Sequence, residues 1–108
     1  MEKIDPKKLL EMFGGDKAIA QRFIDLFVKE IPGLKRQLQE ATEKNQLDEI
    51  GLHAHTIKSQ CRYIGLDKMA EKAANIEEIT EKGGSNQLNV LIQSLIADLD
   101  ENGFKVIF

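Results

Sequence analysis

The sequence is poor in the residues that support several common functions. A single cysteine, Cys61, rules out a disulfide within the chain. With 15 basic and 18 acidic residues the formal charge is −3, so the basic excess that neutralises nucleic-acid phosphates is missing. No apolar run approaches the roughly 20 residues that span a bilayer, and the first residues contain no apolar signal core. We therefore expect a cytoplasmic domain that binds neither nucleic acid nor membrane.

Strand-like segments are also scarce. Apolar and polar residues alternate convincingly only in the last five residues, 104–108, and the rest of the chain has helical periodicity. The 108 residues suffice for one modest core but not for a core plus a separate nucleotide-binding fold. We predict a single all-α domain over residues 1–108, with its core at about 4–103.

The first two predicted helices differ greatly in length. The short one covers 6–13, with Asp5 as its N-cap. Asp16 caps the second, whose apolar positions continue in phase on both sides of Pro32. A proline at this point produces either a break into two helices or a kink in one. Because the phase is unchanged, we predict one kinked helix over about 16–43.

Three further amphipathic helices follow. Asn45 is a possible N-cap of the third helix, and Gly65 ends it. The fourth helix covers about 66–82, and Ser85 or Asn86 caps the fifth. Short loops make neighbouring helices antiparallel. The predicted architecture is an antiparallel up-down four-helix bundle with a short extra N-terminal helix.

Two histidines on the third helix face different ways. Residues on a helix are rotated by about 100° per position, which places His55 about 120° from the apolar seam and Lys58 within about 60° of His55. His53 lies about 160° from His55, so the two rings cannot chelate one metal ion from a regular helix, and we predict no metal site. The apolar seam comprises Leu47, Ile50, Ala54, Ile57, Cys61 and Ile64.

The His55 and Lys58 side chains have the chemistry that phosphoryl transfer requires. A neutral imidazole can attack phosphorus, and a neighbouring ammonium group can offset the charge that arrives with a phosphoryl group. Gly51 and Ser59, one turn away on either side, are small and leave the His55 ring accessible. Taken alone, however, a histidine near Lys58 is also common on solvated helix faces.

Residues at fixed distances in sequence from His55 resemble the signature of the histidine-containing phosphotransfer (HPt) family. The signature has an apolar residue two positions after the histidine, a lysine at three, usually a glycine at four and a glycine at ten. The corresponding residues are His55, Ile57, Lys58, Ser59 and Gly65. The apolar-acidic pair Ile76-Glu77 also resembles the family, and the resemblance covers roughly residues 4–100. Ser59 departs from the usual glycine.

The resemblance implies a phosphorelay intermediate in two-component signal transduction. In this role His55 accepts a phosphoryl group from an aspartyl-phosphate receiver domain and passes it to another receiver. The implied partners are response-regulator receiver domains, a hybrid histidine kinase, or both. No cofactor is expected on this chain, since the receiver supplies the Mg²⁺. The domain is expected to be a monomeric phosphoprotein rather than an enzyme.

The resemblance also implies roles for individual residues. Lys58 would pair with the added phosphoryl charge, and Glu77 would hydrogen-bond the far ring nitrogen and orient the ring; the alternative for Glu77 is a solvated flank residue. Docking candidates around His55 are Gly51, Leu52, Ser59 and Arg62, although Arg62 can equally be a solubilising charge. Met12 and Ile19 could join this surface, but we predict both in the core.

Two other functions remain open. The same amphipathic helices could serve a protein–protein interaction or dimerisation domain without phosphate chemistry. A histidine-kinase dimerisation domain also carries a helical histidine, but its helices pair between subunits, whereas this chain supplies four helices for its own core.

Overall fold

The computed structural model describes residues 2–101, 104, 106 and 108, and within them the chain is all helical. Five helices are present in the described part, with no strand, as predicted. Their bounds agree with the predicted ranges to within one or two residues. The helices are α1 (Pro6–Met12), α2 (Lys17–Glu43), α3 (Leu47–Tyr63), α4 (Asp67–Glu81) and α5 (Leu88–Glu101).

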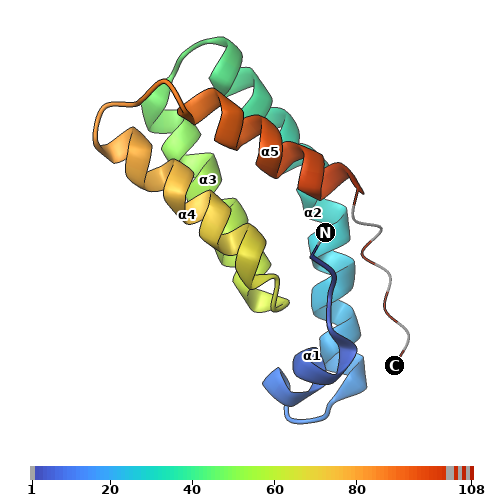
Figure 1. Cartoon of the computed structure of the whole chain (residues 1–108). Coiled ribbons are helices and arrows are strands. Elements are labelled where there is room, and N and C mark those ends of the chain that lie inside the picture. Colours follow the sequence, from blue (N-terminus) through green and yellow to red (C-terminus); the bar gives the residue numbers. More distant parts are fainter. Residues whose placement is uncertain (1, 102–103, 105, 107) are drawn as a thin grey trace.

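Helices α2 to α5 form the bundle, and α1 lies beside the beginning of α2 (Figure 1). Helices α3 and α4 lie side by side along their lengths. Polar contacts also join neighbouring helices: Gln60 of α3 donates to Glu30 of α2 at 2.6 Å, and Lys72 of α4 bonds Ser94 and Asp98 of α5. Isoleucine, leucine and alanine side chains from all the helices fill the space between them.

The predicted cap at Asn45 was wrong. Asn45 has a φ of 53° and follows the end of α2, where the N–H of Gln46 bonds the carbonyl of Ala41. Asparagine tolerates this left-handed conformation, which closes a helix C-terminus. Helix α3 begins at Leu47 without a side-chain cap. The predicted stop at Gly65 is confirmed, since this residue adopts a φ of 75° directly after Ile64, the C-cap of α3.

Helix α2 continues through Pro32 as one helix, but the prediction that Ile19 near its beginning is buried was wrong. Ile19 and Leu26 are exposed, whereas Ala20 and Ile24 are buried. The buried residues of α2 are Ala20, Ile24, Phe27, Ile31, Leu38 and Ala41.

The described part of the C-terminal segment packs on the bundle. Phe104 is buried and meets Phe27 edge to face, with ring centroids 4.8 Å apart. Val106 and Phe108 pack against the core, whereas residues 105 and 107 of the predicted apolar tail lie outside the described residues.

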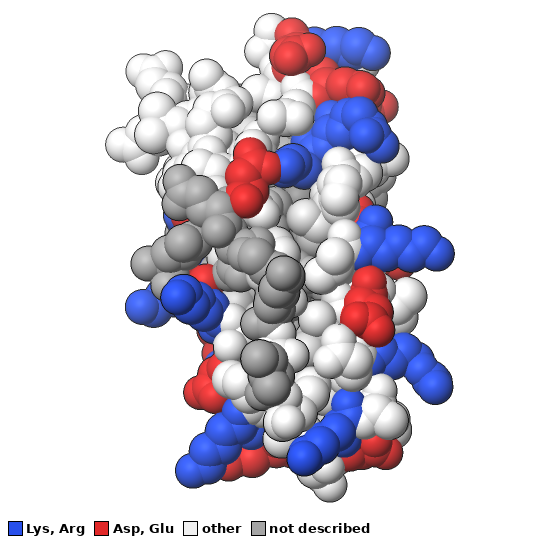
Figure 2. Space-filling view, turned by 90° about the vertical axis from the view of Figure 1, so that its right-hand side faces the viewer, with Lys and Arg blue, Asp and Glu red and all other residues white. Residues whose placement is uncertain are grey.

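Charges of both signs are mixed on the surface. Figure 2 shows the face that carries the C-terminal segment, on which basic and acidic side chains are interspersed around a band of uncharged residues. No basic patch forms among the described residues of this face. Within the described chain, no helix has both the length and the apolar character needed to cross a membrane.

We expect Glu2→Ala to lower the free energy of unfolding by about 0.5–2 kcal/mol, the usual cost of losing a helix cap. Leu66 at the start of α4 offers no side-chain acceptor, and the Glu2 carboxylate instead accepts the N–H groups of Lys68 and Met69, both at 2.8 Å. Urea denaturation of the variant measures this cost. The control is Lys3→Ala at the exposed neighbouring position, and an equal effect of both changes would contradict the capping role.

Candidate functional site

His55 lies on the outer face of α3, as the helical phase predicts. Ala54, one position before His55, and Ile57, two positions after it, are fully buried in the core. The His55 side chain is 54% exposed, and His53 is half-buried on the other side of the helix. A molecule docking on α3 can therefore reach the ring of His55.

Glu77 of α4 connects His55 and Lys58 through its two carboxylate oxygens. Its Oε2 lies 2.7 Å from His55 Nδ1, and its Oε1 lies 2.5 Å from Lys58 Nζ. Because an ionised carboxylate only accepts hydrogen bonds, Nδ1 carries the proton and donates it. In the neutral ring the lone pair then lies on Nε2, the nitrogen away from Glu77.

The environment keeps Glu77 ionised. Burial of the carboxylate opposes its charge, but hydrogen bonds from Lys58 and His55 outweigh burial and lower the pKa of Glu77 below its ordinary value. The Glu77 side chain is 19% exposed and that of Lys58 is 15% exposed, so solvent screens this pair only partly. The site thus holds a fixed negative charge next to the half-exposed ring.

The lowered pKa of Glu77 predicts a pH dependence of stability. A lowered carboxyl pKa stabilises the fold at pH values above the ordinary glutamate pKa of about 4.3, and this contribution is lost as the pH falls through the lower value of the folded state. We expect Glu77→Gln to destabilise the protein near neutral pH and to differ less from the parent in acid. Urea denaturation as a function of pH measures this difference.

The matched control for this titration is Glu78→Gln. Glu78 pairs with Lys82 one turn away on the exposed side of α4 and should matter less, because solvent screens such pairs. A difference between Glu77→Gln and the parent that is the same at all pH values would contradict the assigned ion pair.

The four docking candidates of α3 lie around His55 but differ in what they contact. Leu52 is 61% exposed and Arg62 is also exposed. The Ser59 hydroxyl donates to the backbone carbonyl of His55 at 3.2 Å, so it is bound within its own helix. Gly51 faces α4 at the position of Thr80.

A groove of about 300 Å³ runs between α3 and α4 beside the ring. On its α4 side Glu77 was predicted, whereas Thr80 and Glu81 were not, because they belong to no motif and only the pairing of the helices brings them there. The groove is lined by Leu47, Asp48, Gly51, Leu52, His55, Glu77, Thr80 and Glu81.

Met12 and Ile19 correct the predicted core, since they are 46% and 40% exposed. Nearby, Phe23 stacks on Phe13 with ring centroids 4.7 Å apart and lies 6.2 Å from the ring of Tyr63. Tyr63 is exposed and was missed as a surface candidate, although its position on α3 is rotated only about 80° from His55. The first two helices therefore extend an apolar surface past the end of α3.

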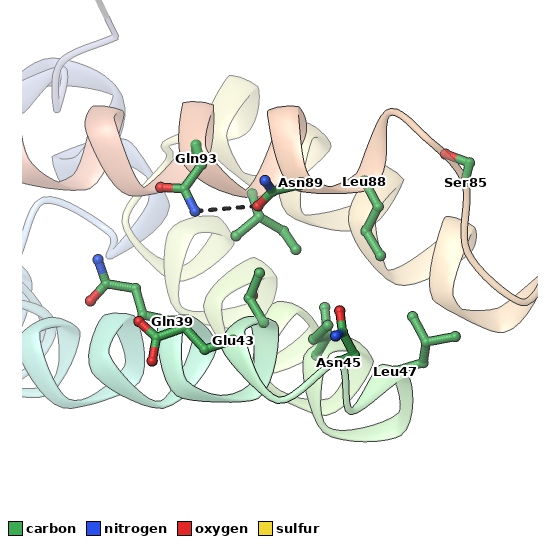
Figure 3. Close-up of a pocket in the computed structure, with 11 residues that line it drawn as sticks. Gln39, Glu43, Asn45, Leu47, Ser85, Leu88, Asn89 and Gln93 are labelled. Carbon is green, nitrogen blue, oxygen red and sulfur yellow. Dashed lines mark hydrogen bonds between the residues drawn. The ribbon is translucent and has the colours of Figure 1, made fainter.

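A cavity larger than this groove lies elsewhere, between α2 and α5 (Figure 3). It has a volume of about 540 Å³ and is lined mainly by amide and hydroxyl side chains over an apolar floor. Gln39, Glu43, Asn45, Ser85, Asn89 and Gln93 line its walls. It shares only Leu47 with the groove beside His55.

Other reactive groups do not form a second centre in the described part of the chain. No group of three or more histidine, cysteine or acidic side chains there is placed to hold a metal ion. Burial raises the pKa of the Cys61 thiol to about 12, so it stays protonated and unreactive.

The comparison with protein families defines the class of this domain: the model of the Hpt domain matches residues 22–102. The chain belongs to the Hpt domain family, the phosphotransfer modules of two-component signalling, which interact with receiver domains or kinases. Comparisons with curated proteins and with solved structures give no match. The suspected family membership is thus confirmed.

Proposed function

We propose that this domain is a phosphorelay intermediate that carries the phosphoryl group on Nε2 of His55. The observation that carries the proposal is the half-exposed ring with Nδ1 held by Glu77 at 2.7 Å. This contact favours the tautomer in which Nε2 has the lone pair. The nucleophile is therefore formed and oriented before a partner arrives.

The transfer step follows from these contacts. The Nε2 lone pair attacks the phosphorus of an aspartyl phosphate on a receiver, the Nε2–P bond forms, and the P–O bond to the aspartate breaks with release of its carboxylate. The ring then shares its Nδ1 proton with Glu77, whose negative charge stabilises the positively charged phosphoimidazole. In the onward transfer a carboxylate oxygen of an aspartate on a second receiver attacks the same phosphorus, the O–P bond forms, and the Nε2–P bond breaks so that Nε2 regains its lone pair.

Lys58 is the cation nearest this chemistry. In the free domain it is paired with Glu77 at 2.5 Å. When the phosphoryl group arrives, the ammonium group can turn part of its hydrogen bonding toward the new oxygens, since a lysine has three donors. The chain itself needs no cofactor in this scheme, and the receiver brings the Mg²⁺ that neutralises the transferred group.

Docking would use the apolar surface around the ring. Leu52 and Tyr63 of α3, together with Met12 of α1 and Ile19 of α2, are exposed large apolar residues of the kind that protein interfaces cover. A monomer with one such surface can meet the donor and the acceptor in turn, whether it acts as a free shuttle or as part of a hybrid kinase.

Incubation with a phosphorylated receiver tests the proposal. We expect the domain to gain the mass of one phosphoryl group, in a linkage that is stable to base and labile to acid, and then to lose it to a second receiver. An interaction or dimerisation domain without phosphate chemistry would gain nothing. Absence of any gain with a panel of phosphorylated receivers would reject the relay role.

A further inference from the structure

Helices α3 and α4 approach each other closely one turn before His55, where α3 has a glycine. A Cβ atom added to Gly51 would lie 2.6 Å from Thr80 Oγ1, which is closer than unbonded atoms approach. The next nearest atom, Thr80 Cβ, would be at an ordinary contact distance of 3.5 Å. The threonine hydroxyl alone therefore excludes a side chain at position 51.

The Thr80 hydroxyl is fixed in this place. It donates to the backbone carbonyl of Glu77 at 2.7 Å, and the branched side chain of threonine has few rotamers in a helix. The hydroxyl that contacts position 51 is thus hydrogen-bonded to Glu77, the residue that also hydrogen-bonds the His55 ring. Rotation of the hydroxyl away from Gly51 would break its bond to Glu77.

The Gly51–Thr80 contact and the His55–Glu77 hydrogen bond lie one turn apart on the antiparallel helices α3 and α4. Gly51 precedes His55 by four residues, and Thr80 follows Glu77 by three, so the close approach and the His55–Glu77 bond are successive connections between α3 and α4. The Glu77 carboxylate must also satisfy Lys58, so it has little freedom to follow α4 if the helices separate. The separation at Gly51 therefore controls the geometry at the ring.

From this arrangement we infer that Gly51 and Thr80 are positioning residues, which set the helix separation at which Glu77 holds His55 in the form protonated on Nδ1. The inference rests on the proposed function, because that form leaves Nε2 free to attack phosphorus. It assigns to Gly51 a role distinct from keeping the ring accessible.

The nitrogen-15 NMR signals of the His55 ring test the inference without any phosphotransfer. They are recorded in alkaline solution, at a pH above which the ring signals no longer change. We expect the parent to be mainly the Nδ1–H tautomer, and Gly51→Ala to lose most of it in favour of Nε2–H. Uptake of phosphate from a phosphorylated receiver should slow several-fold in the same variant.

A matched control and a rescue separate this role from a general loss of packing. Gly33→Ala makes the same change within α2, where the nearest side-chain atom of the described residues is an Arg36 nitrogen at 3.8 Å, and should keep the parental ring signals. Gly51→Ala combined with Thr80→Ala removes the clashing hydroxyl and should regain most of the Nδ1–H form. Should Gly51→Ala not fold, Thr80→Val replaces the hydroxyl by a larger methyl group and should shift the tautomer the same way.

Two results would overturn the inference: a folded Gly51→Ala or Thr80→Val variant with parental ring signals, or a double variant that shows no recovery. Neither depends on a partner. If the parent has the expected tautomer but accepts no phosphoryl group from any receiver, the proposed function fails while the positioning role remains.

Discussion

The His55→Gln variant should accept no phosphoryl group from a phosphorylated receiver, so its uptake should fall to background. Glutamine is neutral and of similar length, and its amide can still donate to the carboxylate of Glu77, but it has no nitrogen lone pair able to attack phosphorus. Mass spectrometry after incubation with the donor measures the uptake. The change removes the nucleophile and should preserve the helix.

His53→Gln is the matched control on the same helix. His53 is half-buried and points away from Glu77, so this variant should accept phosphate as the parent does. Circular dichroism of both variants checks that α3 and the bundle are intact. Uptake by His55→Gln at the parental level would refute the assignment of the nucleophile, whatever the behaviour of His53→Gln.

Ile57→Ala should lower the free energy of unfolding by about 2–5 kcal/mol, which is the usual cost of truncating a buried isoleucine. Ile57 is fully buried between α3 and its neighbours, and the loss of three carbon atoms leaves a cavity that the bundle fills only in part. Against a typical total stability of about 5–15 kcal/mol, this is a large effect. Urea denaturation followed by circular dichroism measures it.

Lys58→Ala, at the next position, is the control for this prediction. Lys58 contributes an ion pair with Glu77 that solvent screens in part, so we expect its loss to cost less than the cavity left by Ile57→Ala. The same variant should impair phosphoryl transfer, which Ile57→Ala can affect only through the fold. A larger stability loss for Lys58→Ala than for Ile57→Ala would contradict the assigned faces of α3.

The exposure of His55 could be predicted because α3 is regular. A residue one position after the buried Ala54 and two before the buried Ile57 must point away from the core of a straight helix. The Glu77 contact was expected from the resemblance to the family, and the hydrogen bond at 2.7 Å is present. Its second contact, to Lys58, was not predicted, since the rotation and separation of α3 and α4 cannot be read from either helix alone.

The predictions for Met12, Ile19 and Asn45 were wrong because packing between helices decides what these positions do. Met12 and Ile19 are apolar and in helical phase, yet the bundle buries Ala20 and Ile24 in preference to Ile19. Asn45 resembles an N-cap in sequence, but its tolerance of positive φ made it the end of α2. Local patterns predict that a face or a cap exists, while packing decides which of two adjacent residues takes the place.

The sequence by itself determined the number of helices, their approximate ends and the outward direction of His55, because all three follow from periodicity along one chain segment. Only the tertiary structure decided that one carboxylate on α4 reaches both His55 and Lys58, and that Gly51 meets Thr80 beside it. These contacts depend on how far apart two helices lie, and that distance is set by the summed packing of the whole core.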